Sequence, residues 1–129
     1  MPLIAQVAAL IAALLHVGFF LMESVLFGRP TVWARFGLKS AQEADVVRPM
    51  AFNQGFYNLF LAVGILAGLA MVAAANAEAG RAIVLFACAC MVGAGVVLVA
   101  TNRRFLAAGA MQALPPLVTI VATIVAGAS

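Results

Sequence analysis

Residues 82–100 read AIVLFACACMVGAGVVLVA, a stretch without a single charged side chain. A helix needs about 20 mainly apolar residues to cross the hydrocarbon core of a bilayer, which is ~30 Å thick. The stretch shows no alternation of apolar and polar residues, so it favours a helix over a strand of a membrane barrel. We therefore expect one membrane-spanning helix here.

Three further apolar runs accompany this stretch, at residues 3–27, 50–75 and 106–126. The chain of 129 residues is 67% hydrophobic and 9% charged, whereas globular proteins are about 45–50% apolar and about 25% charged. This composition excludes a soluble enzyme, a disordered protein and a secreted disulfide scaffold. We expect one all-α transmembrane domain over residues 1–129, a four-helix bundle with a bend at Pro115 and Pro116.

The long loop at residues 28–48 mixes charged side chains with Trp33 and Phe36, which predicts a short helix at the membrane interface. Ser40 and Glu43 have the spacing of a capping box, and Pro49 suits the first turn of the second span.

Basic residues are distributed unequally between the two sides of the membrane. The loops at 28–48 and 102–104 hold all Lys and Arg residues except Arg81. Because cytoplasmic loops carry the excess of Lys and Arg, we expect a bacterial inner-membrane protein with both termini outside the cytoplasm. The basic residues do not form one face, so nucleic acid is not an expected partner.

All four spans contain polar side chains, which are energetically unfavourable in hydrocarbon. Most of them lie in the cytoplasmic half of the bilayer. His16 and Glu23 are two turns apart and share one helix face. Since polar groups in a bilayer usually face the bundle interior, we expect a polar cavity that opens to the cytoplasm. The predicted ligand-binding residues are His16, Glu23, Asn53, Gln54, Tyr57, Asn58, Thr101 and Gln112.

These residues also have structural interpretations, which the sequence leaves open. Glu23 could pair with Arg29 or Arg104, and His16 could bond to a backbone carbonyl or to Asn58. The amides could simply join helices, and Tyr57 could lie in the interfacial aromatic belt.

Pairs of small residues predict close helix packing, either within the chain or in the homo-oligomer that we expect. The pairs are Gly64 with Gly68, Ala89 with Gly93, and Gly109 with Ala113.

The chain offers few ligands for a metal or cofactor. It has one His, and Cys88 and Cys90 point about 200° apart on a helix. We expect no metal and no cofactor; a haem with His16 as its axial ligand is the option left open.

Three motifs together resemble a family of small bacterial membrane proteins, the domain of unknown function 1304. The motifs are His16 with Phe19 and Glu23, NQGFYN at residues 53–58, and QALPP at residues 112–116. The resemblance implies a four-helix inner-membrane protein without an established activity. It also implies that the polar residues of these motifs form one site. The family more often has Ala where this chain has Pro116, which concerns the bend in the fourth span.

Three functions fit these observations. We favour binding, with transport as an extension, of a small amphipathic or cationic molecule, in which Glu23 neutralises the charge. The second is a membrane-embedded isomerase or hydrolase with His16 and Glu23 as acid and base. The third is a structural subunit whose polar residues only join helices.

Overall fold

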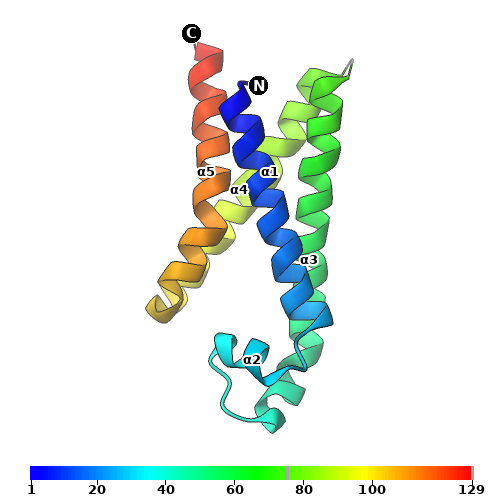
Figure 1. The fold of residues 1–129 in the computed structure, drawn as a ribbon. Helices are drawn as coiled ribbons and strands as arrows, with labels where there is room; N and C mark the ends of the chain where they lie inside the picture. Colours follow the sequence, from blue (N-terminus) through cyan, green and yellow to red (C-terminus); the bar gives the residue numbers. More distant parts are fainter. Residues whose placement is uncertain (75, 129) are drawn as a thin grey trace. The chain divides into compact units, whose positions relative to one another are not determined.

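The computed structural model describes residues 1–74 and 76–128, and every regular element in these ranges is helical. The elements in chain order are α1 (Leu3–Phe20), the π-helix η1 (Leu21–Val25), α2 (Pro30–Trp33), η2 (Ala34–Phe36), α3 (Ala41–Ala73), α4 (Ala77–Thr101), η3 (Arg103–Phe105) and α5 (Leu106–Ala128) (Figure 1).

Four segments among the described residues are long and apolar enough to cross a membrane. Their bounds are Leu3–Val25, Ala41–Ala73, Ala77–Thr101 and Arg103–Gly127. The predicted fold class is thereby confirmed: the protein is all-α, with four spanning helices and a short helix in its first loop.

The chain divides into two compact units, which are described separately. The α4–α5 unit contains residues 1–15 and 61–129, and the η1–α3 unit contains His16–Phe60.

A small hydrophobic core in the η1–α3 unit fixes the loop that follows the first span. Phe27, Ala44 and Ala51 are buried there, and Trp33 and Phe36 pack against them. The loop turns back through Gly37, whose φ of 84° is a conformation that only glycine adopts without strain. The aromatic residues of the predicted interfacial segment therefore pack on the beginning of α3.

Helix α3 begins at Ala41, well before the apolar run that starts at Met50. Glu43 N donates to Ser40 Oγ at 3.2 Å, and Lys39 N donates to the Glu43 carboxylate at 2.8 Å. Ser40 thus caps the helix as predicted. The carboxylate of Glu43, which in a capping box accepts from the backbone N–H of the capping residue, here accepts from that of Lys39. Because this cap starts the helix early, Pro49 lies inside α3 and the expectation that it occupies the first turn was wrong.

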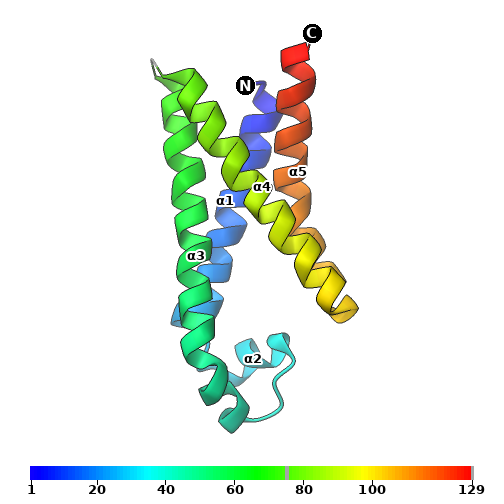
Figure 2. The ribbon, with the colours of Figure 1, turned by 180° about the vertical axis from the view of Figure 1, so that it is seen from behind.

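Glycines set the closest helix approaches in the α4–α5 unit. A Cβ atom on Gly80 would lie 2.5 Å from the carbonyl oxygen of Gly68, where α4 meets α3. A Cβ atom on Gly95 would lie 3.0 Å from the carbonyl oxygen of Gly109, where α4 meets α5. Helix α4 therefore contacts one neighbour near its start and the other near its end, and Figure 2 shows its oblique course between them.

Only some residues of the predicted small-residue pairs lie where two helices pack closely. Gly68, Gly109 and Ala113 lie at these two crossings. A Cβ atom on Gly64 or Gly93 would meet nothing within 4 Å among the described residues, so these two glycines mediate no close approach there.

Helix α5 continues through Pro115 and Pro116, and its ribbon bends along its course (Figure 1). Two buried hydroxyl groups follow the prolines. Thr119 Oγ1 donates to the carbonyl oxygen of Pro115 at 3.1 Å, and Thr123 Oγ1 donates to that of Thr119 at 2.7 Å. Such bonds to the preceding turn satisfy the hydroxyls and often accompany helix bending.

Gly80→Ala is expected to destabilise the protein, because the added methyl group would collide with the backbone of α3 at Gly68 and Val72. Overpacking of this kind costs roughly 1–3 kcal/mol. We expect a lower midpoint of thermal unfolding in detergent. Gly93→Ala, in the same helix but beside open space, is the matched control and should leave the midpoint unchanged or raise it. Equal losses in both variants would contradict the crossing at Gly80.

Candidate ligand-binding site

A π-helical turn ends the first span and carries Glu23. Leu26 N donates to the carbonyl oxygen of Leu21 at 2.8 Å, which is the i to i+5 bond of a π turn. Such turns are rare in proteins and frequently occur at functional sites. In this chain the turn brings two consecutive side chains, those of Glu23 and Ser24, into contact with α3.

The carboxylate of Glu23 is held by an amide from the second span. Asn58 Nδ2 donates to Glu23 Oε2 at 2.7 Å, and Asn58 is only 5% exposed. Hydrogen bonds to a carboxylate are short and stronger than those between neutral groups. Removing one partner would leave the other unsatisfied in an apolar environment, which costs more than the bond itself contributes.

Gly55 allows α3 to approach η1 this closely. A Cβ atom at this position would overlap Ser24 Oγ and would lie 3.1 Å from Glu23 Cβ. Ser24 Oγ also donates to the carbonyl oxygen of Phe52 at 2.8 Å, a second link between the two elements. The glycine of the NQGFYN motif is therefore required by helix packing next to the Glu23–Asn58 pair.

Phenylalanine side chains from the end of α1 and from α3 pack together beside this contact. The ring centroid of Phe56 lies 5.2 Å from that of Phe20, 5.0 Å from that of Phe52 and 6.1 Å from that of Phe60. Phe52 and Phe60 are exposed. The unit thus offers an aromatic apolar surface together with a carboxylate.

The buried face of α3 follows alternating steps of four and three residues. Ala51, Gly55, Asn58, Ala62 and Ile65 are all buried. This spacing is the seam of two packed helices, and Asn58 is its polar member.

Three other predicted site residues lie away from this seam. Asn53 and Gln54 are exposed, and Tyr57 is 59% exposed. Within the η1–α3 unit, the structure brings Glu23 and Asn58 into contact and leaves these three on the exposed surface of α3.

The remaining predicted residues have separate surroundings. His16 is 0% exposed, and its ring meets Phe19 edge-on with centroids 5.3 Å apart. Thr101 Oγ1 donates to two backbone carbonyls one turn earlier in α4, and Gln112 is half-buried in α5. Thr101 and Gln112 belong to the α4–α5 unit, so the convergence of all four spans on one cavity stays a prediction.

The structure describes no group of three or more His, Cys, Asp or Glu side chains that could hold a metal ion. Cys88 and Cys90 are both free thiols, and Cys88 is buried. A haem held by His16 stays a prediction.

Sequence reasoning missed Ser24 and the π turn. Periodicity of apolar residues does not reveal a single wide turn at the end of a span. Gly55 was the available signal, because an isolated glycine inside a helix often marks a close packing contact. The spacing of the small residues on α3 predicts which face of the helix is buried. That spacing would have placed Asn58 on the buried face, and Asn53 and Gln54 outside it.

Gly55→Ala is expected to push η1 away from α3, because the methyl group has no room beside Ser24 and Glu23. We expect a loss of roughly 1–3 kcal/mol in the free energy of unfolding, measured by titration from mild detergent into SDS. Gly64→Ala places the same methyl group on the same helix in open space and should cost nothing. The close approach would be disproved if the two variants unfolded alike.

No curated protein and no solved structure matches the chain. The family described as "Protein of unknown function (DUF1304)" matches residues 10–124, a range that contains η1, the NQGFYN motif and both prolines of α5. The chain therefore belongs to the DUF1304 family of proteins of unknown function.

Proposed function

We propose that this multi-pass membrane protein binds a small amphipathic cation, for which Glu23 is the counter-charge. The observation that carries the proposal is the hydrogen bond of 2.7 Å between Glu23 and Asn58 in membrane-spanning helices. An ionisable side chain within a span is expensive, and it marks a functional site by default.

The chemistry of the pair suits a cationic group. An ionised carboxylate has about four lone-pair positions, and the Asn58 amide uses one of them. Asn58 therefore orients Glu23 while leaving acceptor capacity for a ligand. The packed rings of Phe20 and Phe56 supply the apolar surface that the rest of an amphipathic molecule needs.

Further contacts belong to the same proposal. The exposed amides of Asn53 and Gln54, with Tyr57, would meet the ligand on the cytoplasmic side, towards the start of α3. We also propose that the protein acts as a homo-oligomer.

Binding is better supported than acid–base catalysis. An enzyme of the second kind needs both His16 and Glu23 at the substrate, and His16 is 0% exposed beside Phe19. A purely structural role of the Glu23–Asn58 bond predicts a different outcome in the experiment that follows.

Glu23→Gln removes the charge, while the new amide oxygen can still accept from Asn58. We expect the variant to keep its thermal stability and to bind tetraphenylphosphonium, a lipophilic cation, about tenfold more weakly. Equilibrium dialysis of detergent-purified protein measures the binding. Glu78→Gln, which changes an exposed carboxylate in the first turn of α4, is the control and should bind as the unchanged protein does.

Two results would refute the binding proposal: no saturable binding by the unchanged protein, or undiminished binding by Glu23→Gln. A structural role alone predicts the second result. Uptake of the same cation into proteoliposomes then distinguishes a transporter, which shows flux that Glu23→Gln abolishes, from a protein that only binds.

We also propose that the protein lies in the bacterial inner membrane with the loops at 28–48 and 102–104 in the cytoplasm. In a variant with Cys88 and Cys90 replaced by Ser, a single cysteine at Glu78 should react with a membrane-impermeant maleimide on intact cells. A single cysteine at Gln42 should react only after the cells are opened. Both positions are exposed, and the reverse labelling pattern would overturn the orientation.

A further inference from the structure

A groove lies between α4 and α5, beside the η3 turn that joins them. Its volume is about 670 Å³. Gly95, Gly109 and Ala110 are among the residues that line it, and the two glycines lie where α4 and α5 approach each other closely. Val96 and Leu106 border the groove and are 61% and 62% exposed, so it faces the surroundings of the helix pair.

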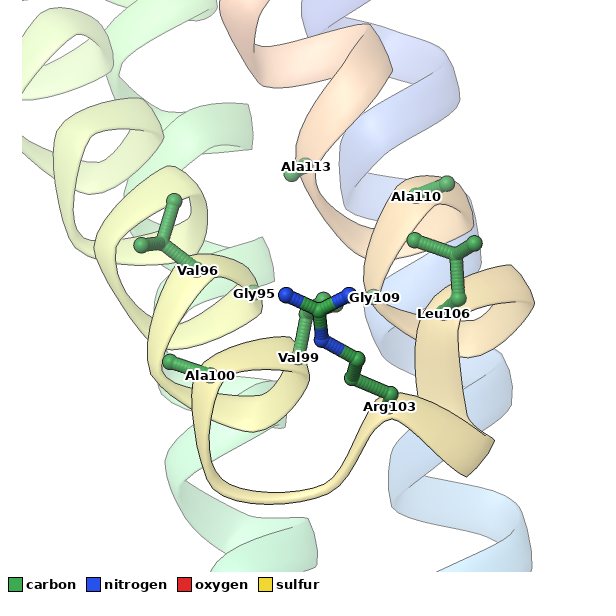
Figure 3. Close-up of a pocket in the computed structure, with 9 residues that line it drawn as sticks. All are labelled: Gly95, Val96, Val99, Ala100, Arg103, Leu106, Gly109, Ala110 and Ala113. Atoms are coloured by element: carbon green, nitrogen blue, oxygen red, sulfur yellow. The ribbon is translucent and has the colours of Figure 1, made fainter.

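The side chain of Arg103 extends from the turn into this groove (Figure 3). In this view the guanidinium points away from the η3 turn, back along α4 and α5. Every other residue that lines the groove is a glycine or has an aliphatic side chain. The groove therefore combines apolar walls with one positive charge.

The turn that carries Arg103 is ordered by its own hydrogen bonds. Arg104 N donates to Asn102 Oδ1 at 3.0 Å, and Phe105 N donates to the carbonyl oxygen of Asn102 at 3.0 Å. Arg104 adds a second positive charge to this turn but is not among the residues that line the groove.

No acidic side chain of the unit is near enough to neutralise Arg103. Glu78 is the only Asp or Glu in residues 1–15 and 61–129, and it lies in the first turn of α4. Arg103 follows the other end of this 25-residue helix, which at 1.5 Å per residue is roughly 35 Å away. The charge in the groove is thus available to an anion from outside the unit.

We propose that this groove binds an anionic phospholipid, with the lipid phosphate on the Arg103 guanidinium and an acyl chain along the apolar walls. A guanidinium matches phosphate oxygens with two parallel hydrogen bonds, and basic pockets between membrane helices recognise anionic headgroups. A water-soluble phosphate would use the guanidinium alone, whereas a lipid also covers the aliphatic walls. This proposal does not rest on the function proposed for Glu23.

The experiment measures lipid binding to detergent-purified protein by native mass spectrometry. The unchanged protein should retain phosphatidylglycerol in preference to phosphatidylcholine of the same chain length. Arg103→Gln should weaken phosphatidylglycerol binding about tenfold. Arg104→Gln removes the same charge from the same turn but leaves the groove intact, so it should change binding by at most about twofold.

A second variant tests the apolar part of the site. Ala110→Leu fills the groove without altering its charge and should also weaken phosphatidylglycerol binding. Three results would overturn the proposal: equal losses in Arg103→Gln and Arg104→Gln, equal retention of the two lipids, or undiminished binding by Ala110→Leu. Inorganic phosphate is the last probe, and a thermal stabilisation equal to that given by phosphatidylglycerol would identify a soluble anion as the ligand.

Discussion

A carboxylate placed in a membrane span has to be stabilised, and the Glu23–Asn58 hydrogen bond does this in the η1–α3 unit. The bond is 2.7 Å long and joins the end of the first span to the second. Hydrocarbon offers no water to replace it, so whatever moves either residue leaves a polar group unsatisfied. The glycine at position 55, the π turn and the Ser24–Phe52 bond all serve to keep these two elements at this distance.

Small residues recur wherever this chain places a charge against a helix. Gly55 makes room for Glu23 and Ser24 on α3, and Gly95 with Gly109 borders the groove that contains Arg103. At Gly55 the missing side chain leaves room for the Ser24 hydroxyl, whereas at Gly95 and Gly109 it allows α4 and α5 to approach each other beside the groove. Close packing through glycines therefore accompanies both sites.

The spans were predictable because each is a long run of apolar residues. The first and the last spanning helices also begin and end close to the bounds of their apolar runs. The start of α3 was not predictable, because the Ser40 cap begins the helix in a polar segment that hydropathy assigns to a loop. Within the site, the free-energy cost of placing polar side chains in hydrocarbon identified Glu23 and Asn58 as candidates. That cost alone could not separate Asn58 from Asn53 and Gln54, because the distinction depends on which face of α3 is buried. The small residues Ala51 and Gly55 mark this face in the sequence, whereas the π turn has no signature in the apolar pattern.

The most direct measurement is a carbon–nitrogen dipolar coupling in lipid bilayers by solid-state NMR, between the side-chain carboxyl carbon of Glu23 and the side-chain amide nitrogen of Asn58. The hydrogen bond places these two nuclei within about 4 Å of each other. The account predicts a coupling of that strength, which disappears in Asn58→Leu. Spectra that show no such coupling in the unchanged protein, or the same coupling in the variant, would contradict it.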